Sequence, residues 1–120
     1  MRRIIIPLSL LTTLSVFAFG AKVVKVIREP KAIILSLEKG FGVQKDARNE
    51  LTFTSVKDGK QLKKVTALTG KTAVEDNHYF SRLNAVTLPT TQGKVRVQGR
   101  IFYCSFAQKY CSVQKIDEEL

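Results

Sequence analysis

Hydrophobic and polar residues alternate along much of the chain after its first 20 residues. The clearest run covers residues 95–103, where Val95, Val97 and Ile101 alternate with arginine and glutamine. A period of two places successive side chains on opposite faces of a strand, one toward a core and one toward water. Shorter runs of the same kind cover residues 33–38, 51–54 and 65–67, and the pattern continues weakly around Val113.

Turn signals separate these runs, and Asp58–Gly59 is the strongest signal for a hairpin. Short strands separated by frequent turns predict an all-β fold, a β-sandwich of antiparallel strands. Residues 73–83 are compatible with one short helical turn, and residues 117–120 are expected to form a frayed acidic end. The turn signals are Lys39–Gly42, Lys57–Gly59, Thr69–Gly70, Asp76–Asn77, Leu88–Pro89 and Gln92–Gly93.

Residues 1–20 have the pattern of a secretory signal peptide. Arg2 and Arg3 precede an apolar stretch, and small residues at Ala18 and Gly20 suit cleavage before Ala21. A retained membrane anchor is the alternative, although the apolar stretch is short for a membrane span. We therefore expect a single domain over residues 21–120, periplasmic, secreted or at the cell surface, that does not span a membrane after cleavage.

The chain is basic, with 20 lysine and arginine residues against 10 aspartate and glutamate residues. Removal of Arg2 and Arg3 lowers the formal charge from +10 to +8. The basic residues are spread out and densest over residues 57–64, which favours a solvated surface and leaves open binding to an anionic surface or matrix ligand. Arginine-rich runs and stacking motifs are lacking, so we expect no nucleic-acid partner.

The sequence offers little for other kinds of chemistry. His78 is the single histidine, and the two cysteines lack the spacing of a zinc site, so we expect no metal. Gly40-Phe-Gly42 is too short for a nucleotide-binding loop, and we expect no cofactor. His78 has no nucleophile motif beside it and is expected to be a loop residue, which argues against a hydrolase.

Cys104 and Cys111 are the two cysteines of the chain and the main candidates for function. Cys104 ends the run over residues 95–103, Cys111 begins the last expected strand, and residues 105–110 connect them. Facing positions of such a hairpin lie within disulfide reach. A disulfide here is either a local structural staple, worth roughly 2–2.5 kcal/mol for so short a loop, or a redox couple.

Nearby residues are compatible with both possibilities. Alternation places Arg100 on the same strand face as Cys104, and Lys109 lies close in sequence; positive charge favours the thiolate form of a cysteine. The surrounding aromatic residues either shield a reactive sulfur or simply fill a core. They are Phe102, Tyr103, Phe106 and Tyr110.

Two segments together resemble a known family. One is Gly93–Cys104 followed by Tyr110-Cys111, in which an aliphatic strand ends in Phe-Tyr-Cys and a second cysteine follows a short loop. The other is Glu38–Phe53, with a glycine-aromatic turn, a polar stretch and a strand. They resemble the N-terminal domain of the thiol:disulfide interchange protein DsbD and related DsbD-like domains. The resemblance implies an immunoglobulin-like β-sandwich.

The same resemblance implies a role for the cysteines. Cys104 and Cys111 would match the family's catalytic pair, which accepts electrons from one thiol partner and passes them to another. Such a module would need a thioredoxin-like or other thiol–disulfide protein as a separate partner, since it would lack its own electron-donor domain. Residues 39–42 and 76–80 are candidates for the family's protective loop. The alternative is a non-enzymatic, adhesin-like binding module with Cys104–Cys111 as a structural disulfide.

Overall fold

A computed structural model describes residues 22–89 and 93–120, and in these residues the chain forms ten strands and no helix. The expected signal peptide over residues 1–20 and Gln92 of one expected turn lie outside the described residues. The strands are β1 (Val24–Glu29), β2 (Ala32–Leu37), β3 (Phe41–Gln44), β4 (Glu50–Ser55), β5 (Gln61–Val65), β6 (Gly70–Thr72), β7 (Tyr79–Leu83), β8 (Val86–Thr87), β9 (Val95–Ser105) and β10 (Tyr110–Glu119).

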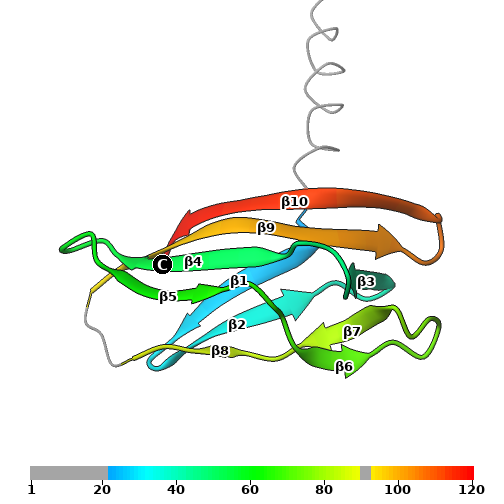
Figure 1. Cartoon of the computed structure of the whole chain (residues 1–120), viewed down its shortest axis with the longest axis horizontal. Helices are drawn as coiled ribbons and strands as arrows, with labels where there is room; N and C mark the ends of the chain where they lie inside the picture. The colour runs from blue at the N-terminus through cyan, green and yellow to red at the C-terminus, as the bar shows by residue number, and fades with distance from the viewer. Residues whose placement is uncertain (1–21, 90–92) are drawn as a thin grey trace, which may run out of the picture.

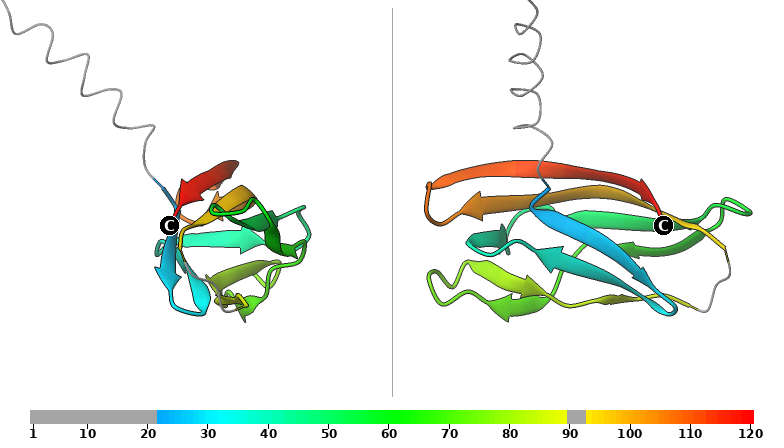
Figure 2. Two further views of the ribbon diagram at one scale, coloured as in Figure 1. Left: turned by 90° about the vertical axis from the view of Figure 1, so that its left-hand side faces the viewer. Right: turned by 180° about the vertical axis from the view of Figure 1, so that it is seen from behind.

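The strands form two antiparallel sheets (Figure 1). The smaller sheet has the order β1-β2-β8, and the larger has the order β5-β4-β9-β3-β7-β6, with β10 paired to β9. The sheets curl around a shared interior, as the end view in Figure 2 (left) shows. The predicted all-β fold, a sandwich of antiparallel strands, is confirmed.

Strand β9 organises the larger sheet. One of its edges pairs with β4 and then β3, and the other pairs with β10. Val95, Val97 and Ile101 are fully buried, while the arginine and glutamine side chains between them are exposed, so the alternation read from the sequence is confirmed. At Gly99 the strands approach so closely that a Cβ atom would collide with the Glu50 carbonyl oxygen, which explains the glycine there.

Both sheets contribute to one hydrophobic core. Ile33 of the smaller sheet and Leu51 and Phe53 of the larger one are its largest fully buried side chains. The side-chain amide of Gln114 also joins β10 to the start of β1. Its oxygen accepts hydrogen bonds from the Val23 and Val24 N–H groups, at 3.0 and 2.9 Å, and its nitrogen donates to the Val24 carbonyl, at 2.8 Å.

The hairpin prediction at Asp58–Gly59 is confirmed, because residues 56–60 connect the paired strands β4 and β5. The turn expected at Lys39–Gly42 is partly wrong, since Phe41 and Gly42 already belong to β3. The possible helical turn over residues 73–83 is wrong as well. Strand β7 fills the second half of that segment, because Phe80 finds a backbone partner in Val43.

The expectation of a frayed acidic end is also wrong. Strand β10 continues to Glu119, and Leu120 exchanges two backbone hydrogen bonds with Val95, at 2.8 and 3.0 Å. Asp117 is paired with Arg96 on the neighbouring strand, at 2.9 Å. The acidic residues are ordered because β9 supplies both backbone partners and a cation.

Candidate functional site

Cys104 and Cys111 form a disulfide between neighbouring strands, as the hairpin spacing suggested. They face each other directly across β9 and β10, and their sulfur atoms are 1.97 Å apart. Residues 106–109 connect the strands, where the Ser105 carbonyl accepts a hydrogen bond from the Lys109 N–H at 2.9 Å. The Ser105 hydroxyl oxygen accepts another from the Gln108 N–H, at 3.1 Å. The short connection therefore fixes the two cysteines in register.

The two sulfur-bearing residues differ in exposure. Cys104 is 5% exposed, whereas Cys111 on the edge strand is exposed. Cys104 lies on the same sheet face as the exposed Arg100, so it is covered by neighbouring segments and not by the main core. A reagent in solution therefore reaches Cys111 more readily than Cys104.

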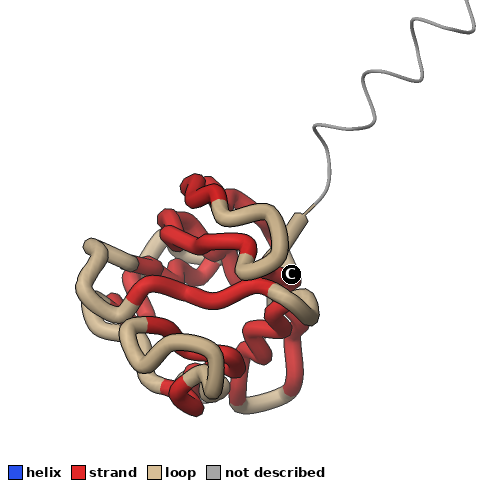
Figure 3. Tube along the Cα trace, turned by 90° about the vertical axis from the view of Figure 1, so that its right-hand side faces the viewer, coloured by secondary structure: helices blue, strands red, loops and turns tan. Residues whose placement is uncertain are grey.

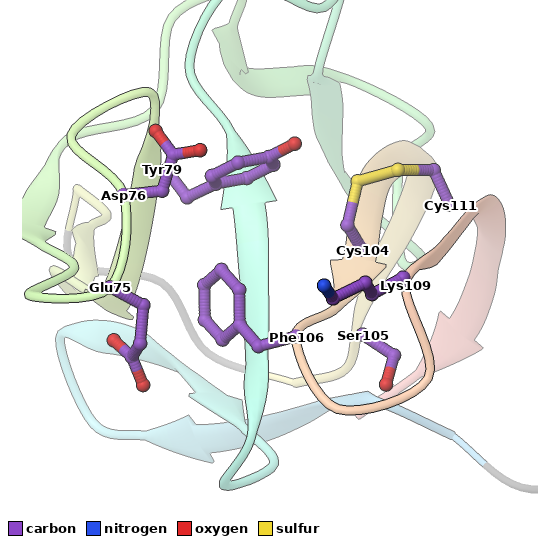
Figure 4. Close-up of a pocket in the computed structure, with 8 residues that line it drawn as sticks. All are labelled: Glu75, Asp76, Tyr79, Cys104, Ser105, Phe106, Lys109 and Cys111. Atoms are coloured by element: carbon purple, nitrogen blue, oxygen red, sulfur yellow. A yellow bond between two sulfur atoms is a disulfide. The ribbon is translucent and has the colours of Figure 1, made fainter.

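A pocket of about 520 Å³ opens beside this disulfide. The β6–β7 and β9–β10 loops, which supply most of its lining, lie at the same end of the molecule, on the right of Figure 1 and facing the viewer in Figure 3. Figure 4 shows Glu75, Asp76 and Tyr79 entering from the β6–β7 side. The other lining residues come from the β9–β10 hairpin and are Cys104, Ser105, Phe106, Lys109 and Cys111.

Two aromatic rings line the pocket. Tyr79 and Phe106 pack edge to face, with ring centroids 5.5 Å apart. Beneath them lies Gly42, which pairs with Cys104 in β9. A Cβ atom on Gly42 would lie 2.5 Å from the Phe106 ring and 2.9 Å from the Tyr79 Cβ atom. The absence of a side chain at Gly42 therefore leaves room for the Phe106 and Tyr79 side chains.

Gly42→Ala is expected to displace Phe106 and to expose more of the disulfide. The Phe106 ring can swing away, but the Tyr79 Cβ atom is fixed to the backbone of β7, so we expect a loss of about 1–3 kcal/mol in the free energy of unfolding. Reduction of the disulfide by dithiothreitol should become several-fold faster. Gly59→Ala is the control, since a Cβ atom there has open space around it and Gly59 does not line the pocket. Its positive φ of 73° costs stability but should leave the reduction rate unchanged.

Two polar residues that the sequence did not single out hold the buried side of the site. The Gln44 side-chain nitrogen donates a hydrogen bond to the Cys104 sulfur at 3.1 Å. Asn49 is 3% exposed; its amide nitrogen donates to the Gln44 carbonyl and its oxygen accepts from the Phe102 N–H, both at 2.7 Å. The approach of β3 to β9 creates these contacts, so no local sequence signal announces them.

Acidic and basic groups share the mouth of the pocket. Hydrogen bonds to Asp76 from the His78 backbone N–H and then from the His78 ring lower the pKa of the Asp76 carboxyl group. These contacts are 2.9 and 2.8 Å long. Asp76 therefore stays charged at neutral pH. His78 lies in an exposed loop, as expected, with its ring on Asp76.

The residues proposed as neighbours of the cysteines are partly brought together. Lys109 and Phe106 line the pocket, whereas Arg100 lies over the Phe102 ring, 6.0 Å from its centre. Tyr103 points to the other face and packs against Phe41, with ring centroids 5.7 Å apart. Of the two candidate protective segments, residues 76–80 supply Asp76 and Tyr79 to the pocket, and residues 39–42 supply Gly42 beneath the rings.

Residues 22–89 and 93–120 contain no group of three histidine, cysteine, aspartate or glutamate side chains placed to hold a metal ion. Nor do these residues include a helix of the length and hydrophobicity that a membrane crossing requires. Comparison with models of protein families found no match, and neither curated proteins nor solved structures matched the chain.

Proposed function

We propose that the Cys104–Cys111 pair carries out thiol–disulfide exchange with partner proteins. One observation carries the proposal: the disulfide borders an open pocket, with Cys111 exposed and Cys104 covered. Reactive disulfides need such access, because exchange proceeds by direct attack of a thiolate on a sulfur atom. The resemblance to DsbD-like domains, in the Phe-Tyr-Cys end of β9 and the second cysteine, points the same way.

Bonds, protons and electrons all balance in this exchange without a cofactor. A thiolate of a reduced dithiol partner attacks the Cys111 sulfur, forming a mixed disulfide, and the Cys104–Cys111 bond breaks. Cys104 leaves as a thiolate and takes up a proton. The partner's second thiolate then attacks the partner's first sulfur, which is bonded to Cys111 in the mixed disulfide. This step releases the Cys111 thiolate, which is protonated in turn. The partner has lost two electrons and the cysteine pair has gained them.

The reduced pair would pass these electrons to a client disulfide by the reverse steps. The proposal places the protein outside the cytoplasm, in the periplasm or at the cell surface, because residues 1–20 resemble a signal peptide. Its partners would be a thioredoxin-like or other dithiol donor and a disulfide-bearing client. The mechanism needs a donor dithiol and a client disulfide, and the described residues supply neither.

The test is the reduction potential of the pair, measured by equilibrating the protein with glutathione or dithiothreitol buffers and trapping the thiols. We expect a value of about −120 to −270 mV, with exchange fast enough to follow by rapid quenching. A potential below about −300 mV with slow reduction would contradict the proposal and indicate a structural staple. The adhesin-like alternative then predicts salt-sensitive binding to an anionic ligand, unchanged when both cysteines are replaced by alanine.

A further inference from the structure

We propose that Gln44 sets the direction of exchange at this disulfide by stabilising Cys104 as the leaving sulfur, so that attack falls on Cys111. The inference rests on the proposed function and adds a residue to it. The donor is the side-chain amide of Gln44 at the end of β3, 3.1 Å from the Cys104 sulfur. Gln44 touches a reacting atom, so its role would be catalytic.

The backbone that carries this amide is held from two sides. Gln44 pairs with Tyr79 of β7, one of the residues that line the pocket. Its carbonyl accepts the hydrogen bond from the buried Asn49, whose oxygen holds the Phe102 N–H two residues before Cys104. Asn49 thus ties the backbone of Gln44 to the strand that carries Cys104. The backbone of Gln44 is therefore held beside Cys104, and its amide already donates to the Cys104 sulfur in the disulfide form.

Cys104 and Cys111 differ in what can stabilise each of them as a thiolate. A thiolate on the exposed Cys111 can be hydrated by water. A thiolate on Cys104, which is 5% exposed, loses much of that hydration, and burial disfavours its charge. An N–H donor that favours the charged form offsets this cost, and a hydrogen bond gains strength where water is excluded. A sulfur that is a more stable thiolate is also the faster leaving group.

The charged groups at the pocket mouth do not favour a thiolate on one cysteine over the other. Glu75, Asp76 and Lys109 line the pocket that borders both cysteines, and they remain in place when Gln44 is changed. A substitution at Gln44 therefore changes the donor to one sulfur and leaves the surrounding charges as they are.

The experiment compares the wild-type protein with Gln44→Leu and Gln44→Glu, using glutathione as the attacking thiol. Brief reaction, acid quenching and peptide mapping identify the cysteine that carries glutathione. In the wild-type protein we expect glutathione on Cys111. In Gln44→Leu we expect reduction to be about tenfold slower, because Cys104 becomes a poorer leaving group, while the reduction potential stays close to that of the wild-type protein, because Cys104 is protonated once it is reduced.

Gln44→Glu keeps the shape of the side chain but places a carboxylate beside the sulfur, so it should slow reduction further. It also serves if the leucine variant fails to fold. Gln108→Leu is the matched control, because Gln108 is exposed in the hairpin loop and contributes its backbone N–H to Ser105. Its rate and potential should equal those of the wild-type protein.

Glutathione attacks any accessible disulfide given enough time. The rates and attachment sites of the wild type and the Gln44 variants can therefore be compared whatever the reduction potential of the wild-type pair. A wild-type potential below about −300 mV would overturn the proposed function and not the role of Gln44. Equal rates and attachment sites in wild type, Gln44→Leu and Gln44→Glu would overturn the role of Gln44. Attachment to Cys104 in the wild-type protein would overturn it as well.

Discussion

Phe53→Ala is expected to lower the free energy of unfolding by about 3–5 kcal/mol. Phe53 is fully buried in β4 and packs in the core that both sheets share. Its removal loses the transfer free energy of the ring and leaves a cavity that the rigid strands around it close only in part. Urea unfolding followed by circular dichroism, with the disulfide intact, gives the difference.

Phe102→Ala is the matched control for Phe53→Ala. Phe102 is half-buried on the outer face of β9, where Arg100 lies over its ring. We expect it to cost about 1 kcal/mol, because less apolar surface is returned to water. Equal losses in the two variants would mean that the interior between the sheets is not the main source of stability.

Asn49→Ala should lower the free energy of unfolding by about 2–4 kcal/mol and also slow the reduction of the disulfide. The substitution leaves the Gln44 carbonyl and the Phe102 N–H without their side-chain partner, and each polar group left without a partner costs roughly 1–3 kcal/mol. Gln44 would then be held less firmly beside Cys104, which weakens its hydrogen bond to the leaving sulfur. We expect slower reduction by dithiothreitol together with the lower unfolding free energy.

Asn84→Ala is the matched control for Asn49→Ala, because it removes an asparagine that is exposed and not buried. Asn84 is exposed, and its amide donates to the Thr69 hydroxyl at 3.0 Å. Water can replace that bond, so the loss should stay below about 0.5 kcal/mol. A similar small loss for Asn49→Ala would show that Asn49 does not hold β3 against β9.

The fold class followed from local patterns, and the interior of the sheet did so most clearly. Alternation over residues 95–103 reports which side chains of β9 are buried, because a half-buried strand exposes every second residue. Strand β1 was not among the expected strands, although Val24 and Val26 alternate with Lys25 and Ile27 in the same way. Its closeness to the expected signal peptide hid a signal that was present.

Other features had no local signal. The helical turn considered for residues 73–83 gave way to β7, because a distant strand, β3, provides its backbone partners. The acidic residues at the end of the chain suggested fraying, but Arg96 and Val95 hold them from a strand more than twenty residues earlier. The charges of a segment indicate that it prefers water, but they do not indicate which distant strand pairs with it.

The candidate site shows the same division. The Cys104–Cys111 disulfide followed from a strand, a short loop and a strand, which are all local. Gln44, Asn49 and Tyr79 reach the cysteines only through the pairing of β3 with β9 and β7. Spacing along the chain identifies neighbours within a hairpin, but it cannot identify side chains that the sheet order brings to it.

The central place of β9 also bears on the order in which the chain can fold. Strands β4 and β5 can pair with each other early, as can β3, β7 and β6, but these two parts of the larger sheet are joined only through β9. They can therefore assemble into one sheet only after residues 95–105 have been synthesised, in the last quarter of the chain. The β9–β10 hairpin, in contrast, depends on contacts close in sequence, and such contacts form first. We expect this hairpin to be the nucleus onto which the earlier strands assemble. Until it appears, one edge of β3 and one edge of β4 stay unpaired, and unpaired strand edges are prone to aggregation.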